Sequence, residues 1–327
     1  MLLCFFPQSL HLSKVDDMIG RLCKPSAEQW TCNGPTKVVL KKLHNSQLIS
    51  KEYLNQLYEF HRVLHFGSIA NFFGITKDPS SNYMFVMRYY ENGDLHSYLD
   101  EAQGMLCWRD IVEMLWGISG GIEYIHENEL IHGNIHGGNL LVENELDSID
   151  IRISDVGLHC LIDMKNSNGF YGVLPYIAPE ILKGGLATKA SDIYSFGIIM
   201  WTLSAGIRPF CNRPHDIKLA TEIYLGHRPE IIDGTPNVYI QLMSQCWHSD
   251  HLKRPTASQL YELLGNWVNT ICDEPQQSEL SVQFDIAEEK RFSDLKKTIF
   301  HQDIHPNAFY TSRLLYFPEL IDSTRDE

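Results

Sequence analysis

The segment SDIYSFGIIMWTLSAG, residues 191–206, constrains the fold most strongly, because it is apolar on nearly every side of a helix. Such a helix is stable only when other elements enclose it, so a large packed helical region must surround it. Ser191 is the expected N-cap of this helix, and Gly206 is expected at its C-terminal end. No apolar run in the sequence is long enough to span a bilayer, so we expect no membrane insertion.

From Asp94 the sequence pattern changes and becomes mostly helical. A long helix is predicted by an apolar stripe at spacings of three and four, made of Ile111, Leu115, Ile118, Ile122 and Ile125. Further helices are predicted at 215–225, 236–247 and 256–271. Two short strands are expected at 140–142 and 149–153, on either side of a polar turn.

The residues before Asp94 show a different pattern. Strands are predicted at 36–42 and 83–90, with a mostly polar helix at 47–65 between them. We therefore predict an α+β, bilobal fold with a small β-rich lobe containing one main helix and a larger, mostly helical lobe. The predicted parts are an N-terminal segment 1–16, a small lobe 17–88, a large lobe 89–271 and a partly disordered tail 272–327.

Composition excludes some classes of function. The chain has 27 Lys+Arg and 41 Asp+Glu, a net charge of −14, which argues against a general nucleic-acid or anionic-membrane binder. The eight cysteines form no CxxC pair, which indicates reduced thiols. The first ten residues, MLLCFFPQSL, are apolar but lack a basic region, so they are not predicted to be a signal peptide. We expect a cytoplasmic protein, with the nucleus as the alternative.

Several short motifs follow one another along the chain. They are VVLK at 38–41, HGNIHGGN at 132–139, DVG at 155–157, APE at 178–180, Asp192 in SDIYSFG and Arg254 in KRPT. Each motif alone is weak, but together they are strong because they keep their register. From about residue 17 to residue 270 the chain resembles a protein kinase domain, in particular the tyrosine-kinase-like branch.

The resemblance assigns Lys41 to the α- and β-phosphates of ATP. Strand alternation places Lys41 on the opposite face from its neighbour Lys42. The family pairs this lysine with a glutamate on the next helix, where this chain has Gln56, whose amide lacks the charge. Glu52 or Glu59, on the same helical face, are the alternative partners.

The phosphate-binding loop is poor in glycine. In IGRLCKPS, residues 19–26, only Gly20 matches the family pattern, and Pro25 lacks an N–H donor. Arg21 and Lys24 either contact phosphate or are ordinary exposed bases. We expect weakened nucleotide binding.

Asn134 occupies the position of the catalytic aspartate. The aspartate of the family accepts the proton of the substrate hydroxyl, whereas an amide is not a base at neutral pH. His132 matches a structural histidine of the motif, and His136 is a candidate stand-in for a phosphate-contacting lysine. In many members of the family an arginine at the position of Gly133 binds the phosphate of a phosphorylated activation loop. Because glycine has no side chain, a phosphate on Ser167 would have no evident binding partner here.

Other positions of the family pattern persist. Asn139 and Asp155 match the two metal-ligand positions, whose oxygens suit Mg²⁺, although both could equally be relics of the fold. Met87 falls where the family lines the back of the adenine pocket, and a core methionine would look the same. Three residues are expected to be structural, namely Glu180, Asp192 and Arg254.

The sequence therefore favours a pseudokinase that acts as a signalling scaffold or regulator, with weak or no phosphotransfer. ATP and Mg²⁺ are the implied cofactors, with binding weak or absent, and other signalling proteins are the implied partners. The alternative is an active ATP-dependent Ser/Thr or Tyr protein kinase. The sequence does not indicate an oligomeric state.

Overall fold

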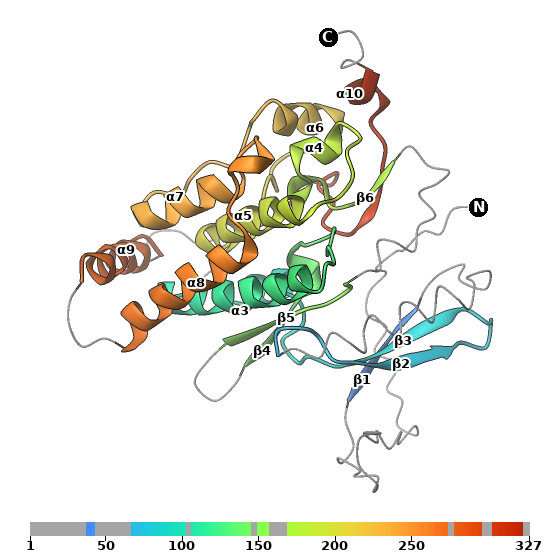
Figure 1. The fold of residues 1–327 in the computed structure, drawn as a ribbon, viewed down its shortest axis with the longest axis horizontal. Coiled ribbons are helices and arrows are strands. Elements are labelled where there is room, and N and C mark those ends of the chain that lie inside the picture. Colours follow the sequence, from blue (N-terminus) through green and yellow to red (C-terminus); the bar gives the residue numbers. More distant parts are fainter. Residues whose placement is uncertain are drawn as a thin grey trace, which may run out of the picture.

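A computed structural model describes residues 37–42, 67–102, 106–144, 149–156, 169–273, 278–295 and 303–322. These residues form a small β lobe and a larger helical lobe (Figure 1), which confirms the predicted bilobal α+β fold. The predicted N-terminal segment 1–16 and the predicted helix at 47–65 lie outside the described residues.

The small lobe contains a three-stranded antiparallel sheet. Its strands are β1 (Val38–Lys42), β2 (Phe72–Lys77) and β3 (Tyr83–Arg88), in the order β1-β3-β2. The two strands predicted from the sequence are thereby confirmed, each with slightly shorter ends. A small apolar core supports the sheet and consists of Ala70, Phe85, Met87 and Tyr90.

The large lobe begins with α2 (Leu95–Glu101) and α3 (Trp108–Glu127). The predicted apolar stripe of α3 is buried throughout, because this face packs against the rest of the lobe. Helix α3 lies against β5 (Ile149–Ile153), which pairs with β4 (Leu140–Asn144). Gly121 permits this close approach, since a Cβ there would lie 2.7 Å from Ile153 Cδ1.

Helix α5 (Lys189–Ala205) is buried on almost every side, as predicted. The predicted N-cap was wrong, because Thr188 caps the helix and Ser191 is its third residue. The Thr188 hydroxyl accepts from Ser191 N, and the Ser191 hydroxyl accepts from Thr188 N, which makes a capping box. Gly206 ends the helix in the left-handed conformation, with φ +69°.

Further helices complete the large lobe. They are α4 (Pro179–Leu182), α6 (Ile217–Tyr224), α7 (Asn237–Cys246) and α8 (Ala257–Val268), the last followed by a π-helical turn at Asn269–Asp273. The three helices predicted at 215–225, 236–247 and 256–271 are confirmed. None of the helices in the described part of the chain has the length and apolar character needed to cross a bilayer.

The described parts of the predicted tail pack on the large lobe. Helix α9 (Glu279–Leu295) inserts Phe284 against Trp108 and Trp267, with ring centroids 5.8 and 5.6 Å apart. Further on, β7 (Arg313–Leu315) pairs with β6 (Phe170–Gly172), and α10 (Pro318–Asp322) follows. Figure 1 shows this last segment in dark red beside β6, at the opposite end of the lobe from α9. The chain therefore returns to the large lobe twice after α8.

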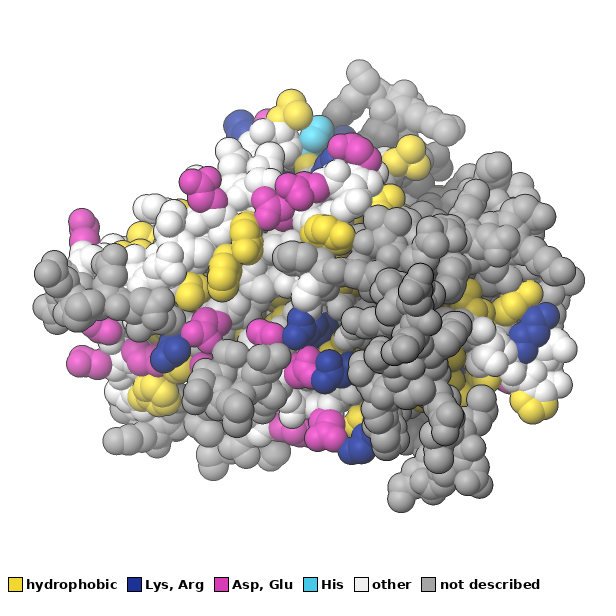
Figure 2. Space-filling model, turned by 60° about the horizontal axis from the view of Figure 1, so that its bottom comes forward, with side chains coloured by type: hydrophobic (Ala, Val, Ile, Leu, Met, Phe, Trp, Pro, Cys, Tyr) yellow, Lys and Arg dark blue, Asp and Glu magenta, His cyan; other side chains and the backbone are white. Residues whose placement is uncertain are grey.

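The described surface carries charges of both signs. On the face shown in Figure 2, Asp and Glu side chains are spread over the molecule with Lys and Arg between them. This face shows a mixed distribution rather than a single basic field.

Candidate functional site

The loop at 131–139 is held to α5 by the carboxylate of Asp192. Its Oδ2 accepts from His132 N at 2.9 Å, and its Oδ1 accepts from Gly133 N at 2.8 Å. His126 Nε2 also contacts Oδ2 at 2.9 Å. Asp192 is buried in the first turn of α5, where the helix dipole favours a negative charge. The start of the loop is therefore fixed by the best-buried helix of the lobe.

The His132 side chain is fully buried and hydrogen-bonds to the backbone on both sides of its ring. Its Nε2 donates to the carbonyl of Ser154 at 2.9 Å, and its Nδ1 accepts from Asn134 N at 3.2 Å. Both ring nitrogens are thus engaged in holding the loop. This geometry supports the scaffold role rather than proton transfer.

The Asn134 side chain points towards the C-terminal segment of the chain. Its Nδ2 donates to Ser312 Oγ at 2.9 Å, and Ser312 Oγ lies 3.4 Å from Asn134 Oδ1. The backbone carbonyl of Asn134 accepts from Asn139 Nδ2 at 3.0 Å. The catalytic-base position of the family is therefore filled by an amide that binds a serine hydroxyl.

His136 binds the same hydroxyl from another side. Its Nδ1 accepts from Gly138 N at 3.1 Å, so in the neutral ring the proton is on Nε2, which donates to Ser312 Oγ at 2.8 Å. Burial lowers the pKa of His136 to about 3, although the charge of Asp155 acts in the opposite direction. A neutral imidazole cannot serve as the cation that contacts phosphate.

Lys41 on β1 forms an ion pair with Asp155, which follows β5. Burial raises the pKa of Asp155, but the charge and hydrogen bond of Lys41 outweigh this effect and the net pKa is lowered. Asp155 adopts φ +65°, an uncommon conformation for a residue other than glycine. The cation and the carboxylate predicted for phosphate and metal are thereby brought together.

Asn139 and Asp155 fit a magnesium site in the chemistry of their donors. The Asp155 Oδ1 atom is buried and has no hydrogen-bond partner among the described residues, which is costly for a carboxylate oxygen. Asn139 is buried and donates through Nδ2, so its side-chain oxygen is available as an acceptor. Mg²⁺ with the phosphates of ATP would supply the missing partner, with Lys41 as the neighbouring cation.

Met87 belongs to the core of the small lobe, beside Phe85 and Tyr90, and is 8% exposed. This placement agrees with the core interpretation and does not test a contact with adenine. Several candidate positions lie outside the described residues, namely Gly20, Arg21, Lys24, Glu52, Gln56, Glu59 and Ser167. Their roles stay predictions.

Glu180 and Arg254 form a bidentate ion pair, with oxygen–nitrogen distances of 2.6 and 2.8 Å. The Arg254 side chain is fully buried and also donates to the carbonyls of Ala190 and His248, each at 2.9 Å. The pair lies at the start of α4 and joins it to α5 and to the turn before α8. Its geometry supports the expected structural role.

Sequence reasoning missed Ser312 and the residues around it. Nothing in SRLL, residues 312–315, distinguishes a site residue from an ordinary polar residue at the start of a strand. The apolar pair Leu314-Leu315 before Tyr316 was the available signal for a short strand.

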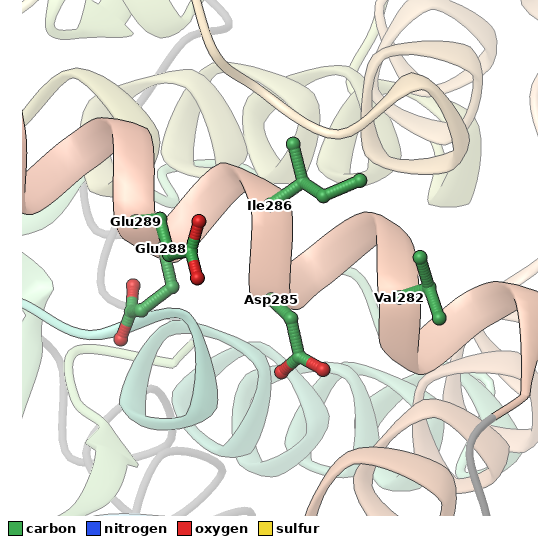
Figure 3. A pocket seen from close by; sticks show the side chains of 5 residues that line it. All are labelled: Val282, Asp285, Ile286, Glu288 and Glu289. Atoms are coloured by element: carbon green, nitrogen blue, oxygen red, sulfur yellow. The ribbon is translucent and has the colours of Figure 1, made fainter.

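A hollow of about 450 Å³ lies elsewhere, over one side of α9. Figure 3 shows the five side chains that line it, Val282, Asp285, Ile286, Glu288 and Glu289, all on this one helix. Glu288 accepts from Trp108 N at 3.1 Å, so it caps the start of α3. None of the residues of the loop at 131–139, called the catalytic loop below after its family motif, lines this hollow, so we do not place the candidate site there.

Comparison with known proteins agrees with this geometry. The family model for protein tyrosine and serine/threonine kinases matches residues 18–264. A putative serine/threonine-protein kinase/receptor of Acanthamoeba polyphaga mimivirus is 28% identical over 233 residues, covering 70% of this chain and 14% of its own length. Human ephrin type-A receptor 8 is 31% identical over 187 residues, covering 55% of this chain and 18% of its own length.

The serine/threonine/tyrosine-protein kinase HT1 of Arabidopsis thaliana is 26% identical over 218 residues, covering 66% of this chain and 55% of its own length. The chain thus spans only part of each of these relatives. The family match covers both lobes and every motif quoted above. The chain belongs to the protein tyrosine and serine/threonine kinase family.

Proposed function

We propose that this chain is a pseudokinase domain, a scaffold or regulator of signalling proteins that transfers phosphate weakly or not at all. One observation carries the proposal. Asn134 and His136 both donate to the hydroxyl of Ser312, and among the described residues no carboxylate hydrogen-bonds to that hydroxyl. In the described part of the chain this hydroxyl contacts two N–H donors and the amide oxygen of Asn134, and none of these groups is a base that can take its proton.

The expected effect on catalysis is large. Loss of a general base typically costs about 10²- to 10⁴-fold in rate. The poor phosphate loop around Gly20 and the replacement of glutamate by Gln56 are two further predicted lesions. Phosphoryl transfer depends mainly on positioning and charge, so one lesion need not abolish it, but we expect three lesions on the same step to abolish efficient transfer.

The second candidate function is an active ATP-dependent protein kinase. It is favoured by the Lys41–Asp155 ion pair and by the buried Oδ1 of Asp155, for which the described part of the chain offers no hydrogen-bond partner. Two of the relatives described above are named as kinases. The two candidates differ in turnover, whereas both allow ATP and Mg²⁺ to bind.

Binding of ATP is tested by the melting temperature of the full chain with and without Mg²⁺ and ATP. We expect a small rise, because a ligand at a concentration equal to its Kd adds only about 0.4 kcal/mol to stability. Asp155→Asn should abolish the rise. A rise in melting temperature as large as a ligand of micromolar Kd produces would contradict the proposed weak binding of ATP.

Transfer is tested with radiolabelled ATP on the full chain and on a generic protein substrate. We expect no label on either, and none after Asn134→Asp alone, because the phosphate loop stays deficient in glycine. Lys41→Ala is the control that identifies contaminating kinases, since it must remove any label made by the chain itself. Robust labelling by the unmodified chain, sensitive to Lys41→Ala, would favour the active kinase.

The location and partners belong to the same proposal. Reduced, scattered cysteines and the acidic net charge support a cytoplasmic or nuclear protein whose partners are other signalling proteins. Localisation of a tagged full chain in cells would test the compartment.

A further inference from the structure

The C-terminal segment 303–322 contacts Asn134 and His136 of the candidate site through Ser312 and adds a short strand, β7, beside β6. β7 pairs antiparallel with β6, with Leu315 opposite Phe170 and Arg313 opposite Gly172. In the described residues these two strands form a sheet of their own. Addition of an extended segment to an exposed strand is a common mode of peptide recognition. Hydrogen bonds between the two backbones supply affinity, and pockets for the side chains supply specificity.

β6 is shaped for a close neighbour. A Cβ at Gly169 would lie 2.7 Å from the carbonyl oxygen of Leu315, so the two backbones approach more closely than another residue would allow. A Cβ at Gly172 would lie 3.4 Å from Asn134 Oδ1. The strand that receives the segment is therefore directly beside the side chain that binds Ser312.

Ser312 is the polar contact of this segment. Its hydroxyl receives Asn134 Nδ2 at 2.9 Å and His136 Nε2 at 2.8 Å. Two donors converge on one oxygen, which is more than a surface serine needs. The pair selects a hydroxyl, since an apolar side chain would leave the buried His136 and the half-buried Asn134 without this hydrogen-bond partner.

Tyr310, two residues earlier, is the apolar anchor. It is 8% exposed and lies edge-on to His96 and His215, with ring centroids 5.5 and 5.0 Å away. Its hydroxyl donates to the carbonyl of Pro209 at 2.7 Å. Buried aromatic residues of this kind supply most of the free energy of many interfaces.

Backbone bonds continue the contact towards the N-terminal end of the segment. His305 N donates to Cys211 O, and His215 N donates to Asn307 O, both at 2.8 Å. Arg313 Nη2 donates to the carbonyl of His215 at 2.9 Å. The loop at 207–215, the catalytic loop and β6 thus contact one continuous extended segment.

We propose that this surface is a binding site for an extended peptide with a tyrosine two residues before a serine, and that the chain's own segment 305–315 occupies it in cis. The proposal goes beyond the pseudokinase function and does not depend on whether phosphate is transferred. A partner protein carrying such a segment would compete with the chain's own copy. Because the copy is tethered, its effective concentration is on the order of millimolar, so the intact chain should bind peptide weakly.

The test uses the full chain and a fluorescent peptide with the sequence of residues 305–316. Tyr310→Ala in the full chain should weaken the cis segment and raise the affinity for the added peptide by about tenfold or more. Tyr316→Ala, a neighbouring aromatic that is 50% exposed, is the matched control and should bind peptide as weakly as the unmodified chain. Peptides carrying Tyr310→Ala or Ser312→Ala should bind the Tyr310→Ala chain more weakly than the natural peptide.

Hydrogen exchange gives a second readout without added peptide. Amides of β6 should exchange faster in Tyr310→Ala and in Ser312→Leu than in Tyr316→Ala, because β7 protects them. If Tyr310→Ala fails to fold, Ser312→Leu serves in both measurements. Peptide affinity that is equal in the variants and the unmodified chain, with unchanged exchange of β6, would overturn the proposal.

A phosphate found on Ser312 after incubation with ATP would separate the two proposals. It would support occupancy of the site by this serine and contradict the proposed lack of transfer.

Discussion

Gly133 and Asp155 share a left-handed backbone conformation, with φ +71° and +65°, at two points beside the candidate site. For Asp155 this conformation is a local strain, of the kind that proteins retain where neighbouring contacts determine the geometry. The Lys41 ion pair is such a contact. Gly133 adopts the same conformation without strain, and its N–H is thereby directed to Asp192. Glycine at this position therefore has a conformational basis besides the loss of the family's arginine.

Gly133→Ala should lower the free energy of unfolding by about 1–2 kcal/mol, the usual cost of a left-handed conformation for a residue with a Cβ. Gly117→Ala is the matched control. Gly117 lies within α3, where an added Cβ would contact nothing within 4 Å, so this change should add about 0.5–1 kcal/mol. Urea unfolding of both variants checks the pair. Equal effects of the two substitutions would contradict the conformational argument.

α5 connects the buried core of the large lobe to the site, because Asp192 in its first turn binds the catalytic loop. The capping box of Thr188 and Ser191 fixes this end of the helix. The start of α5 therefore affects both the stability of the chain and the position of the loop at 131–139. The hydrophobic pattern alone could not locate it, since Thr188 and Ser191 are both good capping residues.

Thr188→Ala should destabilise the chain by about 1 kcal/mol, because the amide of Ser191 loses its acceptor. Thr188→Ser keeps an oxygen at the same position and should restore most of this loss. Denaturant unfolding measures both, and hydrogen exchange of the amides of His132 and Gly133 reports on the loop. An unchanged midpoint in Thr188→Ala would show that the cap contributes nothing to the stability of α5.

Across the whole molecule, the sequence predicted elements whose pattern is local. The stripe of α3 and the apolar sequence of α5 were enough to predict both helices. Motif order predicted Lys41 and Asp155 as separate site residues, one for phosphate and one for metal. The ion pair between them, which joins residues 114 positions apart, was not predicted. The contact of Ser312 with Asn134 could not be predicted, because it joins residues 178 positions apart through a strand of three residues with no motif.

Three histidines near the C-terminal segment make the stability of the whole chain dependent on pH. Burial lowers the pKa of His136 to about 3 and that of His215 to about 4, and it lowers the pKa of His96 well below its ordinary value. In the unfolded chain these side chains titrate near 6.5. Between pH 6.5 and about 4 the unfolded chain therefore binds more protons than the folded chain, so the free energy of unfolding falls as the pH falls.

For each buried histidine, the free energy of unfolding should fall by at most about 1.4 kcal/mol per pH unit, which corresponds to a difference of one bound proton between the unfolded and the folded chain. Urea unfolding of the full chain at pH 7, 6 and 5 measures it, and His215→Asn should reduce the slope by the contribution of one histidine. His136 lies against Ser312 and His215 lies against Tyr310, and burial is the main cause that lowers the pKa of each ring, so proton uptake by either opposes docking of the C-terminal segment. We therefore expect β6 to lose protection from hydrogen exchange at a higher pH than α5 does. Equal stability at pH 7 and pH 5 would contradict the burial of these rings as neutral groups.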